Sequence, residues 1–291
     1  MLSELIDFGV PICVVLLMFI AGTEITFESL PALRHSPRAV LTGSLGQLLI
    51  TPAVGLAVVS ATAPAQRVAV CVILLSLCPG GGISTYYTYI ARANVSLSAL
   101  ITALSTLLCL LTIPAWLSVF PRYSESMLGL AAIPTTHILG QLLLFMCVPL
   151  SAGAMLQRRM PEFVSRHGTH LRTLSFVLIA IVLTLSIISM SGQLGNLARD
   201  IAASSALFIV LAMAAGHVAT IGIPAADRHA VIIESAVRNI AVALLLGKGL
   251  LDTEGLTILV GFLTVYFVIE LIIIMTYASV AQKALLKFSR S

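Results

Sequence analysis

The sequence has few charged residues for its length. Of its 291 residues, 10% are Asp, Glu, Lys or Arg, whereas an ordinary soluble domain has about 25%. Hydrophobic residues make up 59%, and the mean hydropathy is +1.08. So few charges cannot cover the surface of a soluble protein, which excludes a cytosolic enzyme, a nucleic-acid-binding protein and a disordered chain. Because about 20 apolar residues cross a bilayer, the composition predicts an all-α polytopic membrane protein that contacts lipid.

Other signals are missing as well. The five cysteines lie in apolar runs without a CxxC pair, which indicates buried free thiols rather than disulfides or a zinc site. The sequence contains no HExxH and no GxSxG motif, so nothing indicates an intramembrane enzyme or a bound cofactor. No basic residue precedes the first apolar run, so residues 5–24 are expected to be a retained span rather than a cleaved signal peptide.

Apolar windows separated by Pro- and Gly-containing connections predict nine transmembrane helices. Eleven of the 16 Lys and Arg residues fall in one alternate set of connections and four in the other. Because basic residues favour the cytoplasmic side, we expect an N-terminus outside a plasma (inner) membrane and a C-terminus in the cytoplasm. The spans are expected at about 5–24, 39–60, 67–92, 95–119, 131–156, 171–192, 200–222, 228–250 and 256–282.

Two of these spans have unusual interiors. The third contains Cys78-Pro-Gly-Gly-Gly82, which predicts a helix break whose free backbone groups must be enclosed by protein or line a cavity. The eighth carries Glu234 and Arg238 near its middle, where charges are costly and usually functional. Their i, i+4 spacing lets them pair on a continuous helix, and a purely structural ion pair is the alternative. The two spans run in opposite directions, which is typical of inverted halves in a secondary transporter.

A third charge, Glu270, lies inside the ninth span. Two interpretations remain open for this residue. It could lie near the cytoplasmic interface, where a carboxylate is tolerated, or it could be a functional group such as a proton carrier.

The stretch from Leu77-Cys-Pro-Gly-Gly-Gly-Ile-Ser-Thr85 to Ser105-Thr106 resembles the bile acid:sodium symporter family, whose motif reads roughly CPGGxxSNxxTYLARGNxxLSxxxT. A second family motif, ExGxQNSG, is similar to Glu234–Ala241, and the resemblance extends from about Leu17 to Tyr277. It implies two inverted repeats, of four plus five helices here, and two broken helices that cross in a core domain. The whole chain, 1–291, would form one transporter domain, with a panel at about 5–24 and 131–192 and a core at about 39–119 and 200–282.

The resemblance also implies a first Na⁺ site, which falls on Ser84, Thr85, Ser98, Thr102 and Glu234. Thr85 stands where the family usually has asparagine, but all five side chains offer oxygen, the ligand that a hard cation needs. Ser98 and Thr102 are spaced i, i+4 and therefore share a helix face. Hydroxyl groups that bond back to their own helices are the alternative.

A second Na⁺ site of the family corresponds to Gln47, Glu234 and Arg238, where Arg238 replaces a glutamine. A guanidinium is always charged and only donates hydrogen bonds, so it cannot ligate Na⁺. It would repel a cation at about 4 Å by several kcal/mol for an effective dielectric constant near 20. We therefore expect this second site to be absent and Arg238 to replace its charge by pairing with Glu234.

Substrate contacts of the family correspond to Gly82, Ile83 and Asn239, and Arg238 could also clamp a carboxylate. The half-helix that starts near Gly82 would offer free N–H groups to an anion. The resulting hypothesis is a secondary transporter of a small organic anion, a carboxylate, with Na⁺ at one site. Proton coupling through Glu234 or Glu270, uncoupled transport, and a channel or ligand sensor remain alternatives. The sequence leaves open the substrate's identity, the direction of flux and the oligomeric state.

Overall fold

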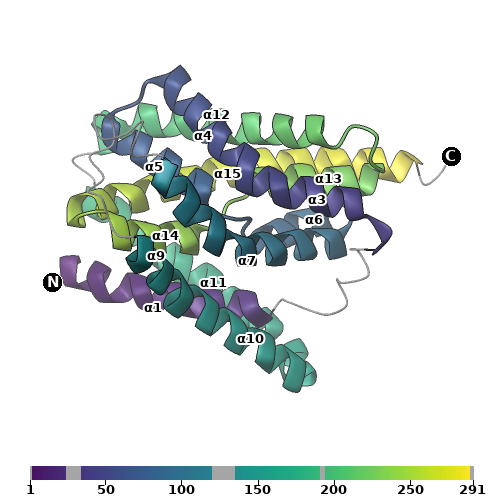
Figure 1. Ribbon diagram of the computed structural model, residues 1–291, viewed down its shortest axis with the longest axis horizontal. Coiled ribbons are helices and arrows are strands. Elements are labelled where there is room, and N and C mark those ends of the chain that lie inside the picture. The colour runs from purple at the N-terminus through teal and green to yellow at the C-terminus, as the bar shows by residue number, and fades with distance from the viewer. Residues whose placement is uncertain (1, 24–33, 120–134, 191–193, 289–291) are drawn as a thin grey trace.

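A computed structural model describes residues 2–23, 34–119, 135–190 and 194–288 of the protein (Figure 1). These ranges are helical apart from short connections and contain no strand. The elements, in which η marks a π-helical turn, are α1 (Leu2–Thr23), α3 (Pro37–Leu45), η2 (Gly46–Ile50), α4 (Thr51–Thr62), α5 (Gln66–Leu77), α6 (Ile83–Ile90), α7 (Val95–Val119), α9 (Thr135–Leu142), η3 (Leu143–Cys147), α10 (Val148–Arg159), α11 (Pro161–Met190), α12 (Leu194–Ala219), α13 (Ala225–Ala236), α14 (Ile240–Leu250) and α15 (Thr253–Phe288).

Six of the described helical stretches are long and apolar enough to cross a membrane. α1, the pair α5 and α6, and α11 occupy the three other positions at which the sequence predicts a span. The apolar window of the α13–α14 stretch is 100% buried inside the protein, whereas those of the other five are 33% to 56% buried. The charged span is therefore enclosed by protein, as an interrupted helix in a membrane requires. The six stretches are Pro37–Thr62, Val95–Val119, Thr136–Arg159, Leu197–Ala219, Ala225–Leu250 and Thr253–Leu286.

Two sets of packed helices lie on opposite sides of the view in Figure 1. α1 packs against α10 and α11, and these helices lie together with α9 along the lower side of Figure 1. α12 packs against α4, α13 and α15 on the other side. α1 begins and α15 ends at opposite ends of the molecule (Figure 1).

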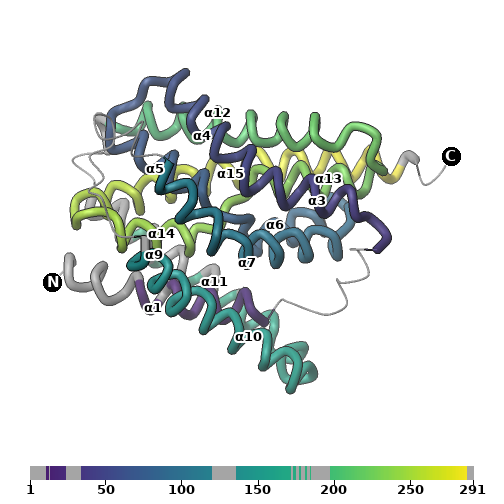
Figure 2. Tube along the Cα trace, viewed as in Figure 1, coloured from purple at the N-terminus to yellow at the C-terminus, as the bar shows by residue number. Residues whose placement is uncertain are grey.

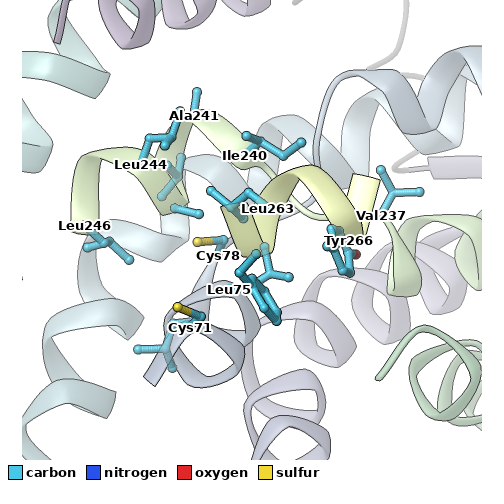
Figure 3. Close-up of a cluster of buried hydrophobic side chains, with 14 of the residues drawn as sticks. Cys71, Leu75, Cys78, Val237, Ile240, Ala241, Leu244, Leu246, Leu263 and Tyr266 are labelled. Atoms are coloured by element: carbon cyan, nitrogen blue, oxygen red, sulfur yellow. The ribbon is translucent and has the colours of Figure 1, made fainter. Parts of the chain in front are cut away.

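Apolar side chains of α5, α14 and α15 meet in a buried cluster beside the first break (Figure 3). Leu75 and Cys78 come from the first broken span, Leu244 from α14 and Leu263 from α15. This packing holds the end of α5 and the helix α14 in place beside the break. The prediction of unpaired thiols is confirmed for the cysteines whose side chains are described, which are Cys71, Cys78, Cys109 and Cys147.

The helix break predicted at the three glycines is present between α5 and α6, and a second break separates α13 from α14 (Figure 2). Asn239 N donates a hydrogen bond of 2.9 Å to Pro79 O, so the two breaks touch each other. A Cβ atom on Gly81 would lie only 2.8 Å from Arg238 O, which explains why this crossing needs a residue without a side chain. Backbone groups that leave the helices are thus paired with one another inside the protein.

The π turn η2 lies directly before a proline in the otherwise continuous stretch from α3 to α4. Pro52 has no N–H to donate to the carbonyl of Leu48, four residues earlier. Trp116 Nε1 donates to that carbonyl instead, at 2.8 Å. Such widened turns are frequent at functional sites, and this one carries Gln47.

Candidate functional site

The fully buried carboxylate of Glu234, near the end of α13, accepts hydrogen bonds from four side chains. Oε1 accepts from Ser84 of α6 and, at 2.5 Å, from Ser98 of α7. Oε2 accepts from Thr102 Oγ1 at 2.9 Å and from Gln47 Nε2 at 2.8 Å. A buried carboxylate is strongly unfavourable unless it is hydrogen-bonded or paired. These four donors therefore offset its burial.

The five residues that the family resemblance assigns to the first Na⁺ site therefore lie close together. The hydroxyl oxygens of Ser84 and Thr102 are 3.3 Å apart, and Ser98 Oγ lies 3.5 Å from Thr85 Oγ1. Ser84, Ser98 and Thr102 donate to Glu234 rather than to their own helices. The described residues contain no group of three or more His, Cys, Asp or Glu that could hold a metal ion. The oxygens gathered around Glu234 are instead of the kind that suits Na⁺.

Gln47 connects this carboxylate to the first break. Its Nε2 also donates to Glu234 O at 2.8 Å, and its Oε1 accepts from Gly80 N at 3.0 Å. One amide side chain therefore fixes the ends of both broken helices. The contact depends on close backbone approach, because a Cβ on Gly80 would lie 2.7 Å from Glu234 Oε2 and 2.8 Å from Gln47 Nε2.

Replacing Gly80 by Ala is therefore expected to destabilise the protein by about 1–3 kcal/mol, the typical cost of an overpacked interior. The melting temperature of the purified protein in detergent measures this effect. Gly140→Ala on α9 is the matched control, because a Cβ there meets nothing within 4 Å. Equal melting temperatures for the two variants would show that the crossing tolerates a side chain.

Arg238 lies in the second break, and 1% of its surface is exposed. Its Nη2 donates to the carbonyl oxygens of Glu234 at 2.7 Å and Ser235 at 2.5 Å. Its Nη1 donates to Cys78 O at 3.1 Å and Thr51 Oγ1 at 3.4 Å. The guanidinium therefore lies where α5 and α13 end, at carbonyl groups that a helix leaves unpaired and that form its negative dipole end.

The structure differs here from the expected side-chain pairing of Glu234 with Arg238. The guanidinium contacts the main-chain carbonyl of Glu234, and the carboxylate oxygens accept from other groups. The physical reason is the break at residues 237–239, which removes the continuous helix that i, i+4 pairing requires. The same carbonyl contacts occupy the guanidinium that was expected to clamp a substrate carboxylate.

The three other expected substrate contacts lie at the starts of half-helices. Gly82 and Ile83 begin α6 and are partly buried. Asn239 is 7% exposed, and its Oδ1 caps α14 by accepting from Ala241 N at 3.1 Å and Val242 N at 3.2 Å. Two helix N-termini, with their positive dipole ends, therefore start at the crossing.

Glu270 lies in the middle of α15 and is 1% exposed, so its side chain is buried inside the protein. Its neighbours include Tyr266, one turn earlier, and Tyr87 of α6, which interact with it electrostatically. Neither tyrosine could be identified from the sequence. A tyrosine in an apolar run gives no signal of its own, and only spacing from Glu270 could have found Tyr266.

Comparison with known proteins gives one family. A sequence model of the Sodium Bile acid symporter family matches residues 11–198. The ileal sodium/bile acid cotransporter of Oryctolagus cuniculus is 30% identical over 187 residues, 62% of this chain and 52% of that protein. The probable sodium/metabolite cotransporter BASS2, chloroplastic, of Oryza sativa subsp. japonica is 40% identical over 91 residues, 31% of this chain and 22% of that protein. The P3 protein of Homo sapiens is 28% identical over 158 residues, 54% and 33% respectively. The chain thus spans about a fifth to about half of the length of these relatives.

Proposed function

The chain belongs to the Sodium Bile acid symporter family, a family of membrane transporters, and on that premise we propose that it is a secondary transporter of a small organic anion coupled to one Na⁺. The observation that carries the proposal is the convergence of three hydroxyl groups and one amide on the buried carboxylate of Glu234. One carboxylate balances the charge of one Na⁺. Hydroxyl groups can rotate their protons away and present lone pairs to a cation, so the same side chains would serve with and without Na⁺.

Arg238 supplies a fixed positive charge in place of a second Na⁺. Its guanidinium already occupies the carbonyl groups of Cys78, Glu234 and Ser235, which are the oxygens that a cation beside Gln47 would need. A second ion there would meet repulsion of several kcal/mol at about 4 Å. The transporter would therefore move one Na⁺ in each cycle.

The substrate would bind at the crossing, where α6 and α14 both begin. The positive dipole ends of the two half-helices favour a negatively charged group such as a carboxylate. Gly82, Ile83 and Asn239 are the residues proposed to contact it. This arrangement supports an organic anion as the substrate.

The chain would cross a plasma (inner) membrane nine times, with its N-terminus outside and its C-terminus in the cytoplasm. An odd number of crossings fits the positions of α1 and α15, which begin and end at opposite ends of the molecule (Figure 1). α1, α9–α10 and α11 would form the panel, and the remaining helices would form the core. Movement of the core against the panel would expose the crossing to each side in turn.

Ser98→Ala tests the cation site. Loss of one ligand in a buried polar site costs about 1–3 kcal/mol, so the Na⁺ concentration for half-maximal uptake should rise about 10- to 100-fold. Uptake of small carboxylates into proteoliposomes, with Na⁺ or K⁺ outside, measures this. Ser105→Ala is the matched control, because Ser105 is equally buried on α7 but donates to Thr102 O of its own helix.

The same vesicles separate the proposal from its alternatives. Accumulation against a substrate gradient when Na⁺ is present supports a coupled transporter. Equilibration without accumulation would indicate a channel, and binding without any flux would indicate a sensor. An equal response of the Ser98 and Ser105 variants to Na⁺ would contradict the cation site.

A further inference from the structure

A second buried polar cluster adjoins the crossing and supplies no ligand to the proposed Na⁺ site. It consists of Glu270, Arg238, Tyr87 and Tyr266, and none of these side chains is more than 1% exposed. Tyr266 Oη donates to Ala236 O at 2.6 Å, so the cluster adjoins the end of α13. Three parts of the chain that are distant in sequence contribute to it, namely α6, the second break and α15.

The cluster contains several polar atoms without hydrogen-bond partners. Among the described residues, the Tyr87 hydroxyl and Arg238 Nε have none, and the two carboxyl oxygens of Glu270 make no close hydrogen bond, although the Tyr266 hydroxyl and the Arg238 main chain lie near enough to interact with them. Buried polar atoms in folded proteins almost always have a partner, and exceptions often mark a function. Such atoms gathered in one cluster therefore indicate a site with exchangeable protons rather than a packing accident.

Groups from three parts of the chain act electrostatically on Glu270. Its interactions with titratable groups are with Arg238 from the second break, Tyr266 on its own helix and Tyr87 on α6. These are the groups that face it from the elements packed on α15 in the described part of the chain.

Each protonation state of Glu270 has hydrogen-bond partners available. The hydroxyl proton of Tyr266 is used on Ala236 O, so its oxygen is left as an acceptor for a protonated carboxyl group. An ionised carboxylate would need two donors, and Arg238 Nε and the Tyr87 hydroxyl are both unused. The site is thus equipped to hold a proton and to release it.

We propose that Glu270 is a proton-binding site of this transporter, a second cation position in which H⁺ rather than Na⁺ binds beside Arg238. This inference rests on the proposed function, because the proton is useful only in a protein that alternates between two states. The carboxylate takes a proton from water on one side and returns it on the other. The cluster is closed in this structure, so proton exchange is confined to conformations in which the second break has moved.

Arg238 links Glu270 directly to the proposed Na⁺ site. Arg238 lies four residues after Glu234 and donates to its carbonyl, so a change in the charge of Glu270 acts on the same break that positions the Na⁺ ligands. Ionised Glu270 draws the guanidinium toward α15, and protonated Glu270 leaves it on the carbonyl groups. Proton binding therefore biases the geometry of the crossing.

Melting temperatures of the full purified chain, measured with NaCl or KCl as the only ligand across a pH series, test this site. The wild type should show a pH-dependent step in melting temperature that Glu270→Gln lacks, whereas both proteins should keep the stabilisation by Na⁺. Glu254→Gln, at an exposed carboxylate 51% accessible and paired with Arg67, is the matched control and should keep the step. Tyr266→Phe removes the acceptor of the acid proton and should shift the step, which provides a second variant if Glu270→Gln does not fold.

The experiment distinguishes failure of the proton site from failure of the proposed Na⁺-coupled transport. A step that persists unchanged in both Glu270→Gln and Tyr266→Phe overturns the proton site and leaves the Na⁺ transporter intact. Absence of any stabilisation by Na⁺ at every pH contradicts the proposed function instead. A step that is lost only in Glu270→Gln, with Na⁺ stabilisation retained, supports both.

Discussion

Glu234→Gln is expected to abolish Na⁺-dependent uptake and to lower the affinity for Na⁺ by about 100- to 1,000-fold. A unit charge at about 4 Å is worth roughly 4 kcal/mol at an effective dielectric constant near 20, and each 1.4 kcal/mol is about tenfold in affinity. The carboxylate also accepts from Ser84, Ser98, Thr102 and Gln47, and glutamine keeps only one acceptor oxygen for them. The Na⁺ concentration that raises the melting temperature measures affinity without a substrate.

Glu254→Gln makes the same chemical change at an exposed carboxylate that pairs with Arg67. It should leave the response to Na⁺ unaltered, because exposed ion pairs contribute about 0–1 kcal/mol. The prediction fails if Glu234→Gln is stabilised by Na⁺ at the same concentrations as Glu254→Gln. A Glu234→Gln protein that folds and binds Na⁺ normally would remove this carboxylate from the cation site.

The first break could be predicted from the sequence because its signal is local. Cys78-Pro-Gly-Gly-Gly82 combines a residue that cannot donate with three that stabilise a helix poorly. The second break has no such signal, since Val237, Arg238 and Asn239 are neither proline nor glycine. Tertiary contacts produce it: Asn239 N bonds to Pro79 O, and Asn239 Oδ1 caps the next helix. A break that depends on the partner segment cannot be seen in a single stretch of sequence.

The candidate site, too, could be predicted only where its contacts follow from local spacing in the sequence. Spacing placed Ser98 and Thr102 on one face, and the structure has both hydroxyl groups on Glu234. The predicted side-chain pairing of Glu234 with Arg238 was wrong, because i, i+4 spacing brings side chains together only on a continuous helix and the helix is broken at residues 237–239. The position of Gln47 depends on a π turn before a proline, and no hydrophobic period encodes such a turn.

Arg238→Gln is expected to create a second Na⁺ site. Without the guanidinium, the carbonyl groups of Cys78 and Ser235 lose this donor, which costs about 1–3 kcal/mol for each buried group left unpaired, whereas Glu234 O keeps its bond from Gln47. The variant should therefore melt at a lower temperature than the wild type in KCl. Na⁺ can bind to the freed oxygens, and a ligand that binds only the folded state stabilises it. NaCl should therefore restore much of the lost stability.

The number of Na⁺ ions moved for each substrate should rise from one to two in Arg238→Gln. Arg238→Lys keeps the positive charge, although without the planar fork of the guanidinium, and should remain at one. Arg67→Gln removes an exposed arginine and controls for loss of charge elsewhere. Two Na⁺ per substrate in the wild type, or an unchanged Na⁺ response in Arg238→Gln, would contradict the replacement of an ion by this side chain. The guanidinium would then be a structural tie between the two breaks, and its removal would lower stability in NaCl and KCl alike.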